Sequence, residues 1–373
     1  MMRQCVILCF LLLTLEESES LAKQKPSKGH NAAVSFGKAT NGGGFGINKP
    51  IISDKQLYIP DESASTKNLI DFLISEECEG VEMDGGLAIG FSSKTGLRGL
   101  YAKESFHKGD FLCAIPFTSA LVMEEEENVS LADAQRGMNF IRKVMDDPEI
   151  VAKWGPYLES LPKKTSNFDP TPDFYTINEI RQLEFPRIVN EALKRKEQLE
   201  AFSSAESVDL DELQFATWLI KSRAFSVLKV NREIGKVFTK SVLIPYVDMI
   251  NHSPDQSNVK LEVVETKAED ESFYSLCATR PIPAGKEVTL SYGSGEASTI
   301  ELLLNYGFVP PKNPNDASML EFGGVDCLTV IDQWSTALKE DEILTRNATG
   351  NLVTVLAFRK RLKQALSEIT NIR

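Results

Sequence analysis

The chain has 373 residues, of which 42% are hydrophobic and 25% are charged. This length and composition suit one large globular domain or two ordinary ones, with a sizeable core. The formal net charge of −12 argues against a general nucleic-acid binder, because such proteins normally present a basic face. An acidic surface suits a basic protein partner.

The first residues predict a secretory signal peptide. An apolar run from Cys5 to Leu15 follows Arg3 and is too short to span a bilayer. Small residues at Ser20 and Ala22 then offer a cleavage site. We therefore expect residues 1–22 to be removed as a signal peptide.

Residues 23–62 form a second, leader-like segment. Up to Ser53 it contains five lysines and no acidic residue, a composition typical of organelle transit peptides. A signal peptide followed by such a segment resembles the leaders that route proteins into plastids of secondary algal origin. The alternative is a flexible linker in an ER-resident or secreted protein.

Four cysteines remain after the signal peptide: Cys78, Cys113, Cys277 and Cys327. No two of them form a Cys-x-x-Cys pair, so the sequence predicts no zinc site. Because they are scattered in apolar contexts, we expect buried free thiols, which favour a reducing compartment.

We expect folded structure to begin near Ser63. Ser65 or Thr66 is the predicted cap of a helix whose apolar residues, Leu69 and Leu73 among them, recur at helical spacing. Short β-prone runs bounded by turn residues then predict three strands, at Leu87–Phe91, Gly99–Ala102 and Phe111–Ile115.

From about residue 131 to residue 222, apolar stripes at helical spacing predict several helices packed on a core. A helix from Ser298 through Asn305 is expected to end with Gly307 as its C-cap. Two more helices are predicted near Leu328–Leu338 and Leu352–Leu366. Strand patterns return between these helical regions, at Leu243–Val247, Val259–Val264, Phe273–Ala278 and Glu287–Ser291.

The first motif that indicates chemistry is an apolar run, residues 243–250, that contains Asp248 and ends on Asn251 and His252. Such a run is expected to be buried, and buried polar groups need partners. The alternative is a turn whose Asn and His side chains bond local backbone.

The second motif is a β-prone alternation that ends on Tyr292 just before Gly293, which holds the ring where a strand ends. The alternative for Tyr292 is a half-buried amphipathic ring with no catalytic role.

Four further segments belong to the same pattern, and the last of them in the chain is Tyr306-Gly307-Phe308. Gly96–Leu100 contains two glycines that let the backbone approach a ligand closely, although an ordinary hairpin turn is the alternative. It lacks the third glycine of a dinucleotide-binding loop. Ser222–Phe225 places Arg223 at a predicted helix end, where a surface ion pair is the alternative role, and Trp154–Pro162 forms an aromatic and proline-rich stretch.

In this chain order, the segments resemble SET-domain protein lysine methyltransferases, especially the branch that includes plant Rubisco large-subunit methyltransferase. The resemblance implies an α+β fold, in which a β-rich, pseudoknotted SET domain occupies residues 63–310. A helical insertion at about 125–220, which includes Trp154–Pro162, splits this domain. A short helical region follows at 311–373.

The resemblance implies S-adenosylmethionine as the cofactor and assigns its contacts. Arg223 would anchor the methionine carboxylate through a charge-assisted fork. Asn251 and His252 would bond the amine, carboxylate and adenine. The remaining cofactor contacts are assigned to Gly96, Leu97, Arg98 and Phe308, of which Phe308 would cover the adenine.

The resemblance also implies a catalytic role for Tyr292, which would orient the target amine. Tyr306 would line the lysine channel, Ser222 would lie beside the substrate, and no metal is implied. A lysine amine must be neutral to attack, and burial beside a sulfonium cation lowers its pKa. Val227 stands where the plant enzyme has a basic residue near its substrate, which predicts a changed acceptor pocket.

The predicted function is S-adenosylmethionine-dependent protein-lysine N-methylation. Protein-histidine N-methylation by the same architecture is an alternative within the enzyme class. A non-catalytic SET-like binding module and a secreted structural protein are alternatives outside it. We expect a monomer that acts on a protein carrying a target lysine, with no nucleic acid and no stable membrane insertion after removal of the leader. The sequence names neither the substrate protein nor the number of methyl groups added.

Overall fold

The computed structural model describes residues 57–83, 85–127, 133–165, 168–231, 236–266, 271–322 and 334–372. The predicted signal peptide, most of the leader and Cys327 lie outside these residues. Among the described cysteines, Cys78 and Cys113 are buried free thiols, as expected, and the free thiol of Cys277 is partly exposed. None of the helices in the described ranges is both long enough and apolar enough to cross a membrane.

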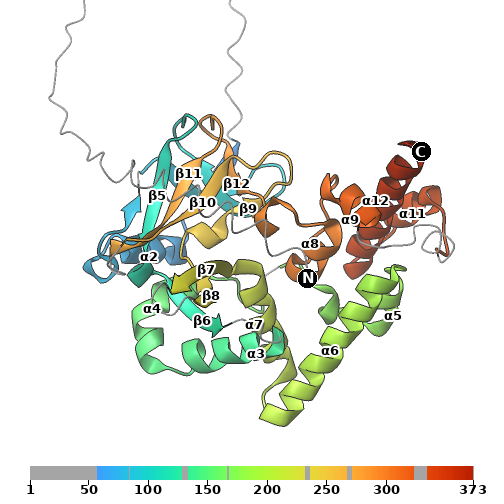
Figure 1. Cartoon of the computed structure of the whole chain (residues 1–373), viewed down its shortest axis with the longest axis horizontal. Coiled ribbons are helices and arrows are strands. Elements are labelled where there is room, and N and C mark those ends of the chain that lie inside the picture. The colour runs from blue at the N-terminus through green and yellow to red at the C-terminus, as the bar shows by residue number, and fades with distance from the viewer. Residues whose placement is uncertain are drawn as a thin grey trace, which may run out of the picture. The chain divides into compact units, whose positions relative to one another are not determined.

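Blocks of strands and blocks of helices follow one another along the chain (Figure 1). The strands are β1 (Tyr58–Pro60), β2 (Glu82–Met83), β3 (Leu87–Ser92), β4 (Arg98–Ala102), β5 (Phe111–Pro116), β6 (Leu121–Glu127), β7 (Phe225–Asn231), β8 (Lys236–Leu243), β9 (Asn251–His252), β10 (Val259–Val264), β11 (Phe273–Ala278) and β12 (Glu287–Leu290). The α-helices are α2 (Ala64–Leu73), α3 (Asp133–Phe140), α4 (Pro148–Ser160), α5 (Ile177–Arg181), α6 (Pro186–Glu206), α7 (Leu210–Arg223), α8 (Thr299–Tyr306), α9 (Asn315–Phe322), α11 (Leu338–Thr345) and α12 (Asn351–Ile372).

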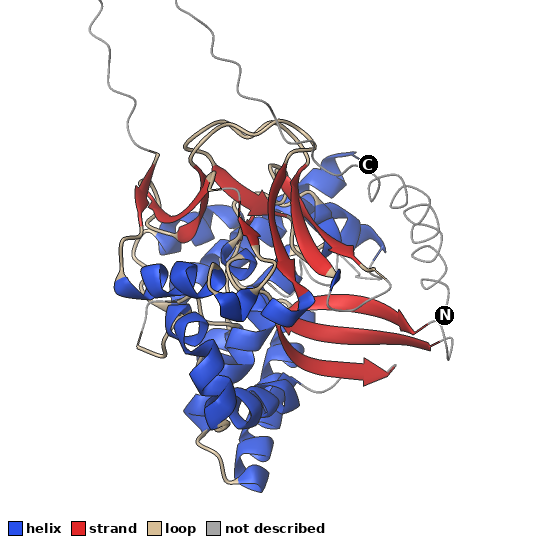
Figure 2. Ribbon diagram, turned by 90° about the vertical axis from the view of Figure 1, so that its left-hand side faces the viewer, coloured by secondary structure: helices blue, strands red, loops and turns tan. Residues whose placement is uncertain are grey.

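The strands form three sheets (Figure 2). One sheet has the order β1-β3-β4-β12-β9, a second has the order β10-β11-β5-β2, and a third has the order β6-β8-β7. Strand β12 runs antiparallel to β4 and parallel to β9. The predicted α+β class and the three early strands are therefore confirmed.

One predicted strand is wrong, and the error concerns the segment before the Asn-His motif. Strand β8 ends at Leu243, whereas we predicted a strand over Leu243–Val247. Pro245 has no backbone N–H to donate to a ladder. Tyr246 takes the rare backbone angles φ 72° and ψ −51°, and the N–H of Val247 donates to the carbonyl of Pro245 at 2.9 Å. The chain therefore makes a tight three-residue turn here instead of continuing the strand.

The first helix begins earlier than predicted. Its N-cap is Ser63, whose side chain accepts from the N–H of Thr66. We expected Ser65 or Thr66 in this role. The hydroxyl of Thr66 instead donates to Asp61 at 2.7 Å, a partner that helical spacing does not reveal.

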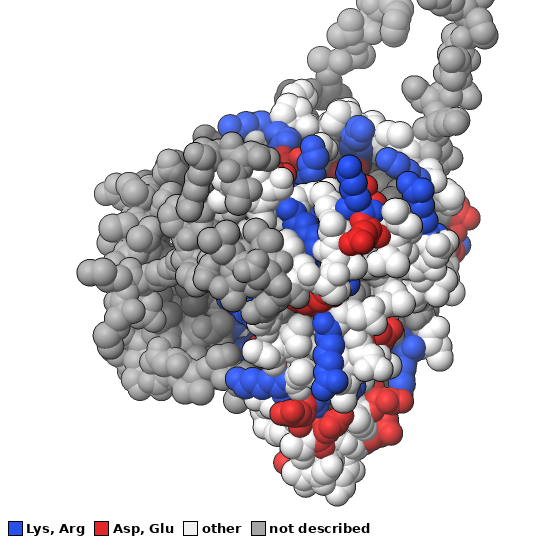
Figure 3. All heavy atoms as spheres, turned by 90° about the vertical axis from the view of Figure 1, so that its right-hand side faces the viewer, with Lys and Arg blue, Asp and Glu red and all other residues white. Residues whose placement is uncertain are grey.

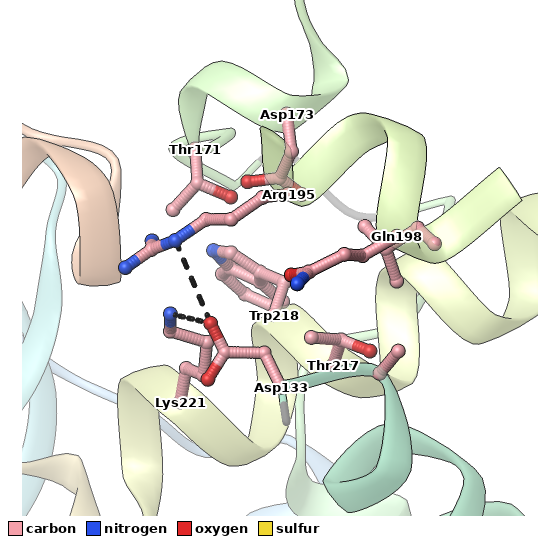
Figure 4. Close-up of a pocket in the computed structure, with 10 residues that line it drawn as sticks. Asp133, Thr171, Asp173, Arg195, Gln198, Thr217, Trp218 and Lys221 are labelled. Atoms are coloured by element: carbon pink, nitrogen blue, oxygen red, sulfur yellow. Dashed lines mark hydrogen bonds and ion pairs between the residues drawn. The ribbon is translucent and has the colours of Figure 1, made fainter. Parts of the chain in front are cut away.

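The helices α3 to α7 lie between β6 and β7, where the sequence predicts a helical insertion. A half-buried ionic cluster holds three of them together (Figure 4). Lys221 of α7 donates to the carboxylate of Asp133 of α3, and Nε of Arg195 of α6 lies 3.6 Å from the same carboxylate. Burial alone would raise the pKa of Asp133, but Lys221 and Arg195 hold it below its usual range.

The cavity beside this cluster measures about 10 Å³, which is enough for about one water molecule. Its polar lining is therefore structural. It fixes the end of α7, where Ser222 and Arg223 lie.

Helix α8 ends at Gly307, as predicted. Gly307 has φ 82°, a left-handed conformation that favours glycine. A Cβ at this position would lie 2.1 Å from the carbonyl oxygen of Asp169. The close approach of the backbone at Asp169 to Gly307 fixes the direction of the chain from Tyr306 to Phe308.

The C-terminal helices pack around a second hydrophobic core, which α5, α6, α8, α9 and α12 share. Helix α12 confirms the prediction near Leu352–Leu366. The other predicted tail helix, Leu328–Leu338, is wrong in its described part, because residues 334–337 are not helical and α11 begins at Leu338. The rest of that prediction lies outside the described residues.

Helix α12 also carries three cations, Arg359, Arg361 and Lys363, that are buried. Each has a buried carboxylate as its partner: Asp341 for Arg359 and Lys363, and Asp316 for Arg361. On the exposed face shown in Figure 3, by contrast, charged side chains of both signs are interspersed.

Candidate active site

The two predicted motifs lie side by side. Asn251 and His252 form β9, which pairs in parallel with Thr289 and Leu290 of β12. Beyond β9, the N–H of Ser253 donates to the carbonyl of Leu290 at 2.8 Å, and the chain reaches Thr289 again at residue 258. Residues 251–258 therefore pass along β12, in the region where the resemblance predicts the pseudoknot.

The imidazole of His252 is held against Tyr292. The backbone N–H of Tyr292 donates to Nδ1 of His252 at 2.9 Å. Because Nδ1 accepts, the neutral ring carries its proton on Nε2. This Nε2 is buried and has no hydrogen-bond partner among the described residues. Burial lowers the pKa of His252 to about 4.

This pKa predicts the charge of the ring at neutral pH. Its value of about 4 lies below the ordinary 6.5, so the folded protein favours neutral His252. The fold therefore has its full stability from this group above pH 6.5, where His252 is neutral in both the folded and the unfolded chain. As the pH falls from 6.5 to about 4, the unfolded chain binds a proton that the folded chain does not, and stability is lost progressively. An NMR titration, with His252→Gln to identify the resonance, should find this imidazole neutral at pH 6, and a ring already protonated there would contradict the geometry.

Tyr292 lies half-buried at the end of β12. Its hydroxyl donates to the carbonyl of Ile250 at 2.7 Å. Burial, followed by the nearby hydroxyl of Tyr306, raises the pKa of Tyr292 well above its ordinary value. The hydroxyl therefore stays protonated at neutral pH, where it can donate and orient but cannot serve as an anionic base.

Four rings converge at this point of the fold. The ring of Tyr292 lies 4.6 Å from that of Tyr306 and 5.0 Å from that of His252, between centroids. Phe308 lies 5.8 Å from His252 and 6.2 Å from Tyr306. The predicted residues at the end of α8 thus join the two motifs in one aromatic cluster.

Asn251 connects this cluster to the predicted glycine loop. Its Nδ2 donates to the carbonyl of Arg98 at 2.9 Å and to Oε1 of Glu287 at 2.7 Å. A Cβ on Gly99 would lie 2.7 Å from Asn251 Nδ2 and 2.9 Å from Glu287 Oε1. Glycine at position 99 is therefore required by the approach of these two side chains. Gly96, with φ +71°, forms the turn that precedes them.

The side chain of Arg98 turns away from Asn251. Its guanidinium donates to Asp61 at 2.8 Å, to the hydroxyl of Thr66 at 2.6 Å and to the carbonyl of Ser160 at 3.0 Å. It therefore fastens β4 to the segments around α2 and α4. Only the backbone of Arg98 meets Asn251, while the side chain of Leu97 is half exposed.

Arg223 reaches the motif from the end of α7. It donates to the backbone carbonyl of Asp248 at 3.1 Å and lies 3.5 Å from its carboxylate. The hydroxyl of Tyr157 donates to the same carboxylate at 2.9 Å. Burial raises the pKa of Asp248, although Arg223 opposes the shift. The Nε of Arg223 is buried without a partner among the described residues, whereas the hydroxyl of Ser222 bonds Leu219 in its own helix.

Two residues of this site were missed in the sequence. Glu287 is an acid in an otherwise apolar or hydroxylated strand, Glu-Val-Thr-Leu, and that break in pattern was the available signal. Tyr157 lies in the Trp154–Pro162 stretch, whose contact with Asp248 spans 91 positions and leaves no local trace. Within the described ranges, no cluster of three His, Cys, Asp or Glu side chains is placed to hold a metal ion.

Comparison with known proteins points to one family. The sequence model of the SET-domain family matches residues 97–293, just over half of the chain. The chloroplastic Rubisco large-subunit N-methyltransferase of Nicotiana tabacum is 24% identical over 60% of this chain and 47% of its own. The chloroplastic fructose-bisphosphate aldolase-lysine N-methyltransferase of Arabidopsis thaliana is 31% identical over 44% of this chain and 35% of its own. The chain therefore spans less than half the length of these curated relatives.

Solved structures agree on the fold. The crystal structure of the SET domain of LSMT, bound to lysine and AdoHcy, has a TM-score of 0.61 over 84% of this chain and 91% of its own, at 17% identity. The structure of Rubisco LSMT bound to AdoMet has a TM-score of 0.56 over 83% and 91%, at 16% identity. With these folds and the matched region in agreement, we conclude that the chain belongs to the SET-domain family.

Proposed function

We propose that the protein is an S-adenosylmethionine-dependent protein-lysine N-methyltransferase. The observation that carries this proposal is the hydroxyl of Tyr292. It donates to the carbonyl of Ile250, the residue before Asn251, while the ring belongs to the aromatic cluster. The names of the relatives support it, since one is an N-methyltransferase of the Rubisco large subunit and the other is a fructose-bisphosphate aldolase-lysine N-methyltransferase.

The residues present fit the amino-acid end of the cofactor. Arg223 offers an unpartnered, buried Nε–H to a carboxylate. Asn251 has both amide protons engaged, which leaves its oxygen for an ammonium. Backbone of the Gly96–Leu97–Arg98 loop would line this part of the site, and Phe308 with His252 would enclose the adenine. When bound, S-adenosylmethionine supplies a methyl group activated by a sulfonium.

The chain's own residues prepare the acceptor. Tyr292 and Tyr306 would form the wall of a narrow lysine channel beside Ser222, and removal of water there lowers the pKa of an entering amine. The carbonyl of Ile250 and the hydroxyl of Tyr292 would fix the amine and the methyl hydrogens through direct and weak C–H···O contacts. Most of the acceleration would then come from positioning, and solvent takes the proton that the amine loses.

Calorimetry with S-adenosylhomocysteine tests the proposal. We expect micromolar affinity for the wild-type chain and loss of binding in Asn251→Ala, with circular dichroism to show that the variant is folded. Peptide mass spectrometry after incubation with S-adenosylmethionine should then find the methyl group on lysine, and a methylated histidine would replace the lysine assignment. A folded wild-type protein that binds no cofactor would refute the enzyme.

The proposal extends to compartment and partners. Two relatives are chloroplastic by name, which supports delivery to a plastid by the leader. The partner would be a lysine-bearing protein that a monomer binds without nucleic acid or stable membrane insertion. Fluorescent fusion of residues 1–62 tests the delivery, and secretion of the fusion would contradict it.

A further inference from the structure

We propose that Glu287 is a positioning residue that fixes the side-chain amide of Asn251, so that the amide oxygen faces the ammonium of the cofactor. This inference rests on the proposed function. Glu287 itself need touch neither the cofactor nor the reacting atoms. It acts through Asn251.

The contacts around Asn251 define the orientation of its amide. Among the described residues, the amide nitrogen has two partners, the Arg98 carbonyl at 2.9 Å and the Glu287 carboxylate at 2.7 Å, and both are acceptors. Only the NH₂ end of the amide can satisfy two acceptors, and a flipped amide would set three oxygens against one another. The two protons of Nδ2 are thereby used, and Oδ1 is directed away from both.

The surroundings hold Glu287 itself in place. Glu287 is the first residue of β12, where it pairs with Tyr101 of β4. Its backbone carbonyl accepts from Nδ2 of Asn258 at 2.8 Å. The absence of a side chain at Gly99 leaves room for the carboxylate against the amide, since a Cβ there would lie 2.9 Å from Glu287 Oε1. The carboxylate is therefore fixed by the sheet and not by the ligand.

The free oxygen of Asn251 selects the chemistry of its ligand. An amide oxygen only accepts hydrogen bonds. The methionine part of the cofactor has one strong donor, the α-ammonium, whereas its carboxylate can only accept. Because the side chain of Asn251 is already ordered before the ligand binds, it loses little conformational entropy on binding, and such preorganisation improves affinity. Without Glu287, one amide proton loses its partner and the amide can turn.

Two ligands separate this role from a structural one. S-adenosylhomocysteine carries the ammonium, and 5′-methylthioadenosine has the same nucleoside and thioether without the amino-acid end. In the full chain, Glu287→Ala should weaken S-adenosylhomocysteine about tenfold, the equivalent of one hydrogen bond, and should leave the affinity for 5′-methylthioadenosine unchanged. Glu287→Gln keeps an acceptor oxygen at this position and should retain wild-type affinity for both ligands.

Glu82→Ala, an exposed glutamate of β2, serves as the matched control and should leave both affinities unchanged. Equal losses for both ligands in Glu287→Ala would show a structural role and overturn the proposal, as would no loss for either. Glu287→Gln as weak as Glu287→Ala would assign the effect to charge and overturn it too. A wild-type chain that binds neither ligand would instead refute the proposed function.

Discussion

Turnover of Tyr292→Phe should fall on the order of 100-fold, the scale expected when a reacting group loses its positioning. The substitution removes the hydroxyl that donates to the Ile250 carbonyl and keeps the ring that packs on Tyr306 and His252. The affinity for S-adenosylhomocysteine should therefore stay close to that of the wild type. Single-turnover methylation and calorimetry on the same preparation measure the two effects separately.

Tyr175→Phe provides the matched control. Tyr175 is fully buried in the second core and is not one of the four rings of the aromatic cluster. The same chemical change there should leave turnover unaltered. Wild-type turnover in Tyr292→Phe would remove the hydroxyl from the mechanism, while loss of cofactor affinity would make its role structural.

Asp316→Ala should lower the free energy of unfolding by about 3–5 kcal/mol, the usual cost of removing one partner of a buried ion pair. The carboxylate of Asp316 is fully buried. It accepts from the backbone N–H and the hydroxyl of Thr299 at 2.8 Å each, and from Nε of Arg361 at 2.7 Å. Its removal leaves the buried cation Arg361 without its buried counter-charge and the first turn of α8 without this acceptor. Urea denaturation followed by circular dichroism measures the loss.

The same arginine supplies the control. Glu368 lies 3.7 Å from Arg361, but its side chain is 60% exposed, and exposed ion pairs contribute about 0–1 kcal/mol. Glu368→Ala should therefore be nearly neutral. Because α8 ends at Tyr306, Asp316→Ala should also weaken cofactor binding. Equal stability of Asp316→Ala and the wild type would mean that the pair does not hold α8.

Local sequence patterns predicted the elements best where one segment determines its own structure. Gly307 ends α8 because its backbone angle is intrinsic to glycine, and the strand over Val259–Val264 coincides with β10. The strand over Leu243–Val247 failed because the turn at Pro245 and Tyr246 overrides an apolar run. The buried cations of α12 resemble a solvated face in the sequence, because their carboxylate partners lie on other elements.

The site was predictable to the same extent. The resemblance pointed to Asn251, His252, Tyr292, Tyr306 and Phe308. The structure brings the four rings together, and Asn251 precedes His252 on β9. The resemblance could not assign the guanidinium of Arg98 to Asp61, 37 positions away. It also passed over Glu287, because hydrogen bonds between distant strands depend on register, and register is not a property of either segment alone.

The long sequence separations within this site also have a consequence for folding. Asn251 meets Arg98 across 153 positions, and Tyr157 meets Asp248 across 91. Contacts that close loops of this length form slowly, since the entropy of closure must be lost before the contact stabilises anything. The cofactor pocket should thus assemble late, after the three sheets and the helices between β6 and β7 have formed. A newly synthesised chain therefore gains no protection from the cofactor until that point, because a ligand stabilises only a state that binds it.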